Sequence, residues 1–226
     1  MELLPPFWGP LMPDSAPVVI VVDDDASIRV ALCSLMASVG LESRAYPDAK
    51  AFLDDGQPDC PACLILDVRL PGQSGLELQQ HLNSSGSHLP IIFITGHADV
   101  PMTVRAMKSG AAEFLLKPFR EQDILEAVHK CIERSREHRQ KAASEEFLAR
   151  RYAQLTPREK QVLTLVASGR LNKQIAGEIG LAEFTVKVHR AQVMRKMAAR
   201  SLAELVRMAD KLKLSPAQGA PMKLAG

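Results

Sequence analysis

The stretch CLILDVRLPGQSG, residues 63–75, carries the pattern that decides the fold of this chain. It begins with a short apolar run, which is typical of a strand buried on both faces of a parallel sheet. A carboxylate, Asp67, follows directly, and a turn leads into a Ser-Gly-Leu-Glu capping box that predicts the start of a helix. This order of strand, acid and helix indicates an α/β fold with polar groups at the carboxyl ends of its strands.

Strand and helix patterns of this kind alternate through the first half of the chain. We expect strands near residues 18–22, 41–46, 63–66, 91–94 and 114–116. The segment from Ile28 to Val39 spaces its apolar residues as one face of a helix, and Gly40 is a candidate for its C-terminal cap. The alternation predicts an α/β domain with a five-stranded, parallel, doubly wound sheet.

Charged and hydroxyl side chains stand at the ends of four of these strands. They are Asp23, Asp24, Asp67, Thr95 and Lys117. Each one alone has an ordinary interpretation, such as an Asp that caps a helix. Because the carboxyl ends of parallel strands line one crevice, we expect the five side chains to converge there. Carboxylates suit a hard divalent metal, and an ammonium with a hydroxyl suits phosphoryl oxygens. The pattern therefore predicts a site that accepts a phosphoryl group.

The second half of the chain shows helical patterns only. Residues 121–151 are rich in Glu, Arg, Lys and Ala, which predicts a long helical linker that softens at residues 142–144. A Thr-Pro-Arg-Glu capping box at 156–159 opens the next helix, which should stop at Gly169. Further helices are expected at 172–179, at 183–198, and from 202 to about 214. These four helices predict a small all-α domain.

The composition and charge of the chain divide it in the same way. We expect a disordered extension at 1–16, an α/β domain at 17–134, a helical linker at 135–152, a helical domain at 153–214 and a disordered tail at 215–226. Residues 1–120 carry 8 Lys and Arg against 14 Asp and Glu, a net charge of −6. Residues 152–226 carry 13 against 5, a net charge of +8. The second half is therefore the part expected to meet a polyanion.

Several classes of protein do not fit this sequence. The longest apolar run, Val18–Val22, is too short to cross a bilayer, and the N-terminus lacks the basic start of a signal peptide. We therefore expect a cytoplasmic protein without a membrane partner. Cys60 and Cys63 have the CxxC spacing of redox and zinc sites, but a second such pair is missing. The favoured interpretation is one thiol in a loop and one in the core.

The first domain resembles the receiver domain of two-component response regulators over about residues 18–132. The resemblance rests on VVDDD, LILDVRLPGQSG, ITGH and KPF, in this order. It implies a flavodoxin-like fold in which Asp67 takes a phosphoryl group from a sensor histidine kinase. It also implies that Lys117 and Thr95 contact the phosphoryl oxygens, and that the peptide bond before Pro118 is cis. Thr95 and Phe114 would form the conformational switch.

The same resemblance implies a Mg²⁺ ion. Its expected ligands are Asp24, Asp67 and the backbone carbonyl of Arg69, with Asp23 ordering a bound water. Such a domain acts on its own phosphoryl group only, so we do not expect an enzyme. A phosphatase or phosphotransferase of the haloacid dehalogenase group is the rival interpretation. That group needs a second Asp where this chain has Arg69.

The second domain resembles the four-helix LuxR/FixJ-type helix-turn-helix over about residues 155–212. The resemblance rests on LTPREKQVL, NKQIAGEIG, TVKVHRAQVMRKM and SLAELV. The helix at 183–198 should pack through Val186, Val193 and Met197 and enter the major groove. Ala182 stands where relatives often carry a capping Ser or Thr. Base contacts are expected from Thr185, Lys187 and Val188, and phosphate contacts from Lys173, Arg190, Arg195 and Lys196.

Together the two resemblances predict a FixJ/NarL-type response regulator, a transcriptional regulator activated by phosphorylation. We expect it to bind promoter DNA as a homodimer, through the receiver domain or through the last helix, residues 201–212. RNA polymerase is a candidate partner. The alternative is a receiver that controls an RNA-binding or protein-binding module. RNA readers usually stack bases on aromatic residues, and the basic half has only Tyr152 and Phe184.

Overall fold

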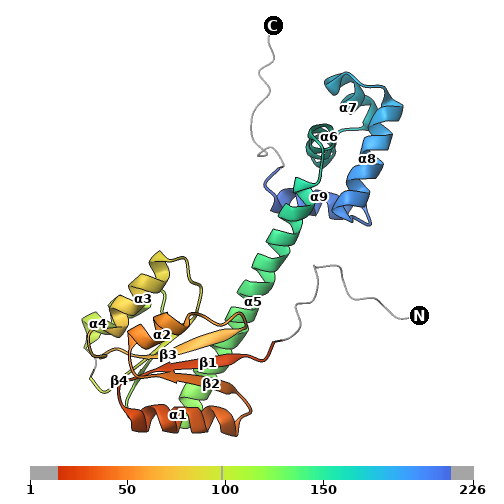
Figure 1. Ribbon diagram of the computed structural model, residues 1–226. Helices are drawn as coiled ribbons and strands as arrows, with labels where there is room; N and C mark the ends of the chain where they lie inside the picture. The colour runs from red at the N-terminus through yellow and green to blue at the C-terminus, as the bar shows by residue number, and fades with distance from the viewer. Residues whose placement is uncertain (1–14, 98, 215–226) are drawn as a thin grey trace. The chain divides into compact units, whose positions relative to one another are not determined.

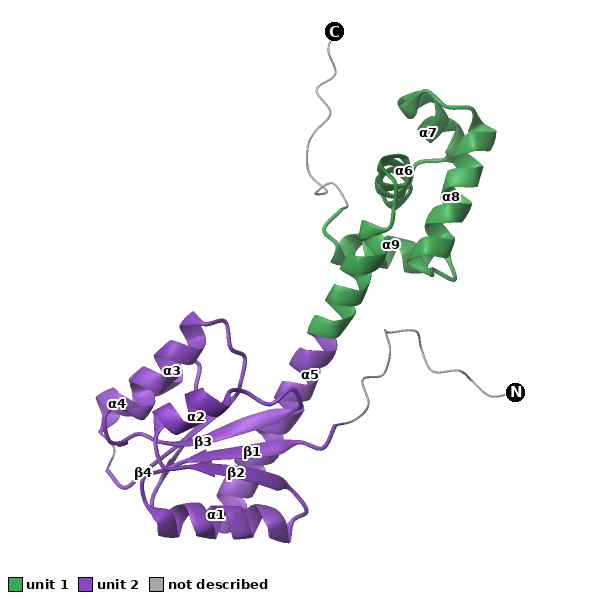
Figure 2. Ribbon diagram, viewed as in Figure 1, with its two compact units in different colours: residues 1–9, 142–226 green, residues 10–141 purple. Residues whose placement is uncertain are grey.

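Figure 1 shows the computed structural model of the chain, which describes residues 15–97 and 99–214. The two ends that were expected to be disordered lie outside the described residues, apart from residues 15 and 16. The described chain separates into two compact units, which Figure 2 colours differently. We call residues 15–141 the sheet unit and residues 142–214 the helical unit.

The sheet unit contains the predicted five-stranded parallel sheet. Its strands are β1 (Val18–Val22), β2 (Glu42–Tyr46), β3 (Ala62–Asp67), β4 (Ile91–Thr95) and β5 (Glu113–Leu116). They pair in the order β2-β1-β3-β4-β5, and every pair is parallel. The strand order reverses between β1 and β3, so the carboxyl ends of these two strands flank the position where such sheets bind ligands.

Helices cover both faces of the sheet (Figure 1). They are α1 (Ala26–Ser38), α2 (Ala49–Asp55), α3 (Gly75–Ser84), α4 (Val100–Lys108) and α5 (Glu121–Ala153). Side chains of α2, α3 and α4 join one apolar core, and those of α1 and α5 join the other. Alternate strand residues serve the two cores: Val18 and Ile20 point to the first, and Val19 to the second. The fold is therefore doubly wound, as predicted.

Helix α5 runs as a single helix of 33 residues and continues through residues 142–144, where we expected it to soften. It is unbroken there, since two of the three residues are Ala, the strongest helix former. The boundary between the two compact units still falls at this place, between residues 141 and 142.

The helical unit contains the four predicted helices. They are α6 (Pro157–Ala167), α7 (Asn172–Ile179), α8 (Glu183–Met197) and α9 (Leu202–Lys211). Their inward faces form one apolar core that includes Val162, Ile175, Val193 and Leu205. The predicted capping box is present at Thr156, whose hydroxyl accepts from the N–H of Glu159. Helix α9 ends before the expected residue 214, because Lys213 adopts a left-handed conformation with φ of 55°.

No helix within residues 15–97 and 99–214 combines the length and the apolar character that crossing a membrane requires.

Candidate functional site

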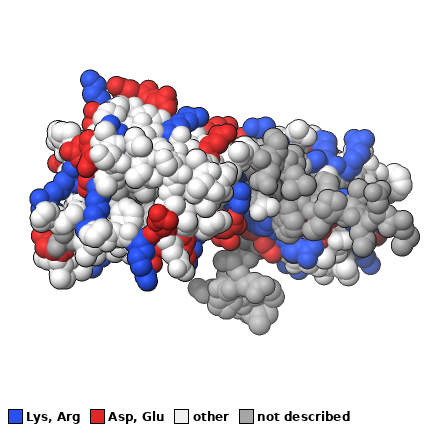
Figure 3. All heavy atoms as spheres, turned by 90° about the horizontal axis from the view of Figure 1, so that it is seen from below, with Lys and Arg blue, Asp and Glu red and all other residues white. Residues whose placement is uncertain are grey.

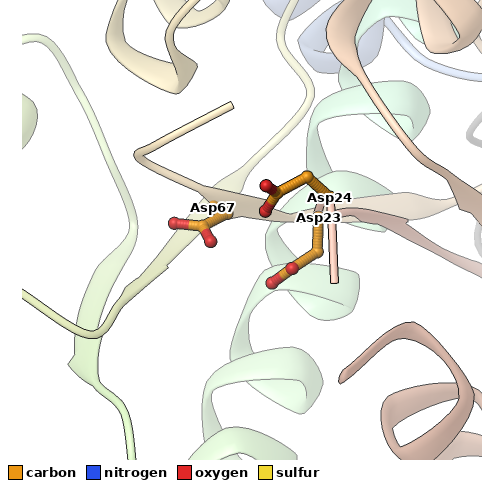
Figure 4. Close-up of side chains that lie close together, drawn as sticks. All are labelled: Asp23, Asp24 and Asp67. Atoms are coloured by element: carbon orange, nitrogen blue, oxygen red, sulfur yellow. The ribbon is translucent and has the colours of Figure 1, made fainter. Parts of the chain in front are cut away.

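The register of the sheet brings the predicted carboxylates together. Val22 pairs with Leu66 across β1 and β3, so the residues that follow them, Asp23 and Asp67, lie side by side. Each of Asp23, Asp24 and Asp67 has a carboxylate oxygen within 4.8 Å of the others (Figure 4). Figure 4 shows the three side chains around a common space at the ends of the two strands. The predicted convergence of these carboxylates is thus present in the fold.

Lys117 reaches the same place from the end of β5. Its Nζ donates to Oδ2 of Asp23 at 2.5 Å and to Oδ2 of Asp67 at 2.9 Å. Asp23 is fully buried and Asp67 is 7% exposed, whereas Asp24 is exposed. A buried carboxylate without a nearby cation is costly, so the ammonium holds the two buried acids in place. The fourth predicted member of the site therefore joins the first three.

The electrostatics of the pair follow from its burial. Burial raises the pKa of the Asp23 carboxyl, and the hydrogen bonds from Lys117 and from the N–H of Asp25 oppose only part of this rise. Burial alone would lower the pKa of the Lys117 ammonium, but its hydrogen bonds to Asp23 and Asp67 raise it instead. The lysine therefore stays charged and is a permanent cation at the site.

Of the two predicted switch residues, Thr95 lies at the end of β4 and Phe114 lies within β5. Thr95, fully buried at the end of β4, donates its hydroxyl to the carbonyl of His97 at 3.0 Å. Phe114 is half-buried, with its ring centroid 6.1 Å from that of Phe93. The peptide bond between Lys117 and Pro118 is cis, as expected. In this structure the Thr95 hydroxyl is hydrogen-bonded within its own loop.

Two residues that support the site were not predicted. Arg29 of α1 donates through Nη1 to the backbone carbonyls of Asp23 at 2.7 Å and of Asp24 at 3.0 Å. A Cβ on Gly75 would lie 2.2 Å from the carbonyl oxygen of Asp67, so only glycine lets α3 begin this close to Asp67. The sequence shows a glycine in the PGQSG turn, but the close contact between Gly75 and the backbone of Asp67 depends on the tertiary structure. Nothing in the sequence singles out Arg29 from other helical arginines.

The donor set fits a hard divalent cation. Its side-chain ligand atoms are all carboxylate oxygens, which Mg²⁺ prefers, and the exposed Asp24 forms no ion pair with the described part of the chain. The backbone of Arg69 is also close, because its N–H donates to Oδ1 of Asp67 at 3.0 Å. The cluster therefore has the oxygen chemistry and the negative charge that such an ion requires.

The CxxC spacing does not form a site among the described residues. Cys33, Cys60, Cys63 and Cys131 are all free thiols. Cys63 lies fully buried in β3, and burial raises its pKa well above the usual range; burial also raises the pKa of Cys131 to about 11. Thiols of this kind are protonated and unreactive. Cys60 and Cys63 are a loop thiol and a core thiol, as favoured.

In the helical unit, α8 separates a packed face from an exposed one. Val186, Val193 and Met197 are fully buried in the core, as predicted. Lys187, Val188 and Arg195 are exposed, and Thr185 is half-buried. Ala182 precedes the helix without a side-chain hydrogen bond to cap it. Basic side chains predominate over the part of the helical unit visible in Figure 3, whereas both signs are interspersed over the sheet unit.

The four residues predicted to contact phosphates differ in their exposure and in their hydrogen-bond partners. Lys173 and Arg195 are exposed, and Arg190 donates to the side chain of Asn172 at 3.1 Å. Lys196 instead turns inward: its Nζ donates to Oε2 of the buried Glu159 at 2.6 Å and to the carbonyl of Gln154 at 3.3 Å. The inward ion pair gives Lys196 a structural role, because a buried Glu needs a cation.

Comparisons with known proteins cover both units. The model of the "Response regulator receiver domain" family matches residues 19–129, and that of the "Bacterial regulatory proteins, luxR family" matches residues 153–209. The chain is 52% identical to "Nodulation protein W" of Bradyrhizobium diazoefficiens over 88% of this chain and 87% of that protein. It is 46% identical to "Transcriptional regulatory protein FixJ" of Azorhizobium caulinodans over 92% and 99% of the two chains.

Solved structures agree with these sequence matches. The structure of the response regulator StyR is similar with a TM-score of 0.82 and 49% identity, and the match covers 87% of this chain and all of that one. Full-length FixJ from B. japonicum is similar with a TM-score of 0.53 and 39% identity, over 88% and 98% of the two chains. Both similarities extend over most of the chain.

Proposed function

Because the chain belongs to the response regulators that join a receiver domain to a LuxR-type DNA-binding domain, we propose that Asp67 is its phosphoacceptor. The protein is a transcriptional regulator that phosphorylation activates. The observation that carries the assignment to Asp67 is its position: a nearly buried carboxylate at the end of β3, between an ammonium and two further acids. We propose that a sensor histidine kinase donates the phosphoryl group.

The chemistry assigned to the site is phosphoryl transfer to a carboxylate. The bond from phosphorus to the histidine nitrogen of the kinase breaks as a bond from phosphorus to an oxygen of Asp67 forms. Such a transfer depends on positioning and on charge neutralisation. Nζ of Lys117 lies 2.9 Å from Oδ2 of Asp67. After the transfer, the same ammonium can form an ion pair with the phosphoryl oxygens instead of the carboxylate. The receiver acts on its own phosphoryl group, and we propose no activity on other substrates.

We assign a Mg²⁺ site to Asp23, Asp24, Asp67 and the backbone carbonyl of Arg69. When bound, the ion would neutralise the negative charge that gathers on the transferring group. Other residues of the chain hold the backbone around these ligands in position. Arg29 holds the backbone carbonyls of Asp23 and Asp24, and Gly75 lets the backbone of Asp67 pack directly against the start of α3.

The proposed switch consists of Thr95 and Phe114. On phosphorylation, the Thr95 hydroxyl exchanges its bond to the His97 carbonyl for one to a phosphoryl oxygen. The space that its loop leaves lets the ring of Phe114, now half-buried against Phe93, turn further inward. Helix α4 packs against β5, which carries Phe114, so the surface of α4 and β5 is the part of the receiver proposed to change.

This surface also supports a proposal for the homodimer. Val100, Val104 and Met107 of α4 and Leu116 of β5 expose between 43% and 76% of their surface, which is unusual for large apolar residues. A second phosphorylated receiver would cover them. Helix α9 is the alternative dimer surface, and RNA polymerase stays a candidate partner on the promoter.

The DNA contacts are proposed for α8 and its surroundings. Thr185, Lys187 and Val188 lie in the first half of α8 and would contact base edges in the major groove. Lys173, Arg190 and Arg195 would contact phosphates. Lys196 stays in this proposed set, although its ammonium is bonded to Glu159 in this structure. The corresponding domain boundaries are 17–134 for the receiver, 135–152 for the linker and 153–214 for the DNA-binding domain, in a cytoplasmic protein.

The phosphoacceptor is tested by incubating the full chain with acetyl phosphate and Mg²⁺. The wild-type chain should gain the mass of one phosphoryl group, and Asp67→Asn should not. Asp54→Asn is the matched control, since Asp54 is an exposed acid of α2 in the same unit. Removing Mg²⁺ with a chelator should abolish labelling of the wild type. Labelling that survives in Asp67→Asn would overturn the assignment.

A further inference from the structure

Helix α8 is apolar on two opposite faces. Val186, Val193 and Met197 face the core, and none of them is measurably exposed. On the opposite side, Phe184, Val188 and Ala191 follow one another at intervals of four and three residues, and Arg195 comes four residues later. Because an α-helix turns once in 3.6 residues, these positions lie in one line along its outer surface. We call Phe184, Val188 and Ala191 the outer strip.

The outer strip is exposed to an unusual degree. Phe184 is 76% exposed and Val188 is 43% exposed, and Ala191 is also exposed. Neither Phe184 nor Val188 belongs to the apolar core of the helical unit or packs against it. An aromatic side chain left in water gives up the stabilisation that its burial would bring, so a cluster of this kind usually marks a surface that binds something.

The charges around the strip indicate what binds. Lys187 lies beside the strip on the same helix, and Arg195 continues its line. Lys173 is exposed near the start of α7, the helix that packs against α8. An apolar line bordered by cations suits the major groove of DNA, where phosphates flank base edges and the methyl groups of thymine.

The position of Phe184 within α8 adds a second constraint. It is the second residue of the helix, which begins at Glu183. In a helix-turn-helix, the N-terminal residues of the second helix are the ones that contact base edges. A phenyl ring has no hydrogen-bonding group, so at this position it can distinguish bases through apolar contact, and thymine offers the C5-methyl group for that purpose.

We propose that Phe184 is a specificity-determining residue of this protein, which selects a thymine methyl group in the major groove of each half-site. The inference rests on the proposed function, since it requires the helical unit to bind DNA. Val188 and Ala191 extend the same apolar surface toward the next bases. The contribution of the strip is contact with methyl groups, whereas Lys187 supplies the hydrogen bonds.

The test begins with DNA selected from a random-sequence pool by the full-length wild-type chain treated with acetyl phosphate. The same selection is run with Phe184→Ala and with Val30→Ala, a control that removes an exposed apolar side chain, 66% exposed, from α1 of the sheet unit. We expect the wild type and Val30→Ala to select a common motif. Phe184→Ala should bind that motif about tenfold more weakly and lose the preference for thymine at one position per half-site.

A second arm removes the methyl group itself. Each thymidine of the selected motif is replaced in turn by deoxyuridine, which lacks only the C5-methyl. At one position per half-site the replacement should weaken wild-type binding about fourfold, since burial of one methyl group has about that value. Phe184→Ala should not respond to the same replacement, because the contact is already gone.

The outcomes separate the inference from the function on which it rests. If the wild type selects no DNA, the proposed function fails. If the wild type and Phe184→Ala select the same motif with equal affinity, the inference fails and the function stands. If DNA binding is unchanged but promoter activation is lost in Phe184→Ala, the ring contacts the transcription machinery and the inference is overturned. Circular dichroism of Phe184→Ala should match the wild type, because the removed side chain is exposed.

Discussion

The acidic site of the receiver and the outer surface of α8 hold their functional side chains in different ways. In the receiver, Asp23 is fully buried and its carboxylate is bonded to Lys117, so groups of the proposed phosphoryl site also stabilise the sheet unit. On α8, the core contacts come from Val186 and Val193, whereas Lys187 and Val188, which are proposed to contact bases, are exposed. Function and stability share residues in the first region and are separated in the second.

This difference teaches where substitutions can be tolerated. Phosphoryl transfer needs a few charged groups at fixed distances from one another, and burial among packed strands provides such positions. Recognition of DNA needs side chains that can change while the fold stays, and a helix with a packed rear face provides them. We therefore expect receiver-site substitutions to alter stability and chemistry together, and substitutions on the outer surface of α8 to alter binding alone.

The largest effect is expected from Lys117→Met. The substitution leaves the buried Asp23 without its cation, and an uncompensated buried charge costs about 3 kcal/mol. Hydrogen exchange of β1 and β3 in the full chain should show this loss, while exchange in α6 and α8 should not change. Lys108→Met is the control, because Lys108 is an exposed cation of α4. A loss of less than about 1 kcal/mol would contradict the structural role of this ammonium.

A somewhat smaller effect is expected from Gly75→Ala. The new Cβ would lie 2.2 Å from the carbonyl oxygen of Asp67, so the backbone at Asp67 must shift. Such overpacking costs about 2 kcal/mol, and labelling by acetyl phosphate should slow with it. Gly96→Ala is the control, because a Cβ at Gly96 would meet nothing within 4 Å. Equal stability and labelling in the two variants would show that the start of α3 does not position Asp67.

The third prediction concerns the ion pair between Lys196 of α8 and the buried Glu159 of α6. Glu159→Gln removes the charged partner of Lys196 and should cost the helical unit about 1.5 kcal/mol, measured by hydrogen exchange in α6. Glu178→Gln, at an exposed acid of α7, should cost nothing measurable. A loss confined to Glu159→Gln would show that α8 also contains one place where charge and stability are coupled.

The same ion pair predicts a pH dependence. Burial alone would raise the pKa of Glu159, but hydrogen bonds from Lys196 and Thr156 lower it below the ordinary value of 4.5. Its contribution to stability is therefore complete above pH 4.5 and is lost as the pH falls through the lower pKa of the folded state. Acid should destabilise the wild-type helical unit more steeply than the Glu159→Gln variant. Identical slopes would contradict this sign.

The smallest effect on stability is expected from Lys187→Ala. Lys187 forms only an exposed ion pair with Glu183 at 3.2 Å, and such pairs contribute about 0.5 kcal/mol or less. Binding to the selected DNA should nevertheless weaken about tenfold, as measured by fluorescence anisotropy. Lys50→Ala, at an exposed cation of α2, should leave binding unchanged. A large loss of stability in Lys187→Ala would break the proposed separation of binding from folding.

Much of the fold and of the site could be predicted because their signals are local. Each strand of the sheet is a short segment, and Asp67 follows β3 directly in the sequence. The residues that were missed act across the fold. Arg29 supports the turn through its reach from α1. For Lys196, which was predicted as a phosphate contact, the missed feature is its ion pair with Glu159, 37 positions away. Spacing along the chain predicts the face of a helix but not the partner that a long side chain finds.

The order of the sequence has a consequence for how the receiver is made. Lys117 is hydrogen-bonded to Asp23, which lies 94 positions earlier in the chain. It directly follows β5, the last strand of the sheet to be synthesised. A chain that emerges from the ribosome therefore presents Asp23 and Asp67 before the cation that neutralises them exists. The incomplete sheet carries clustered negative charge without the cation that is proposed to contact the phosphoryl oxygens. Under the proposed function, the receiver would accept a phosphoryl group only after β5 and Lys117 have been synthesised and have joined the sheet unit.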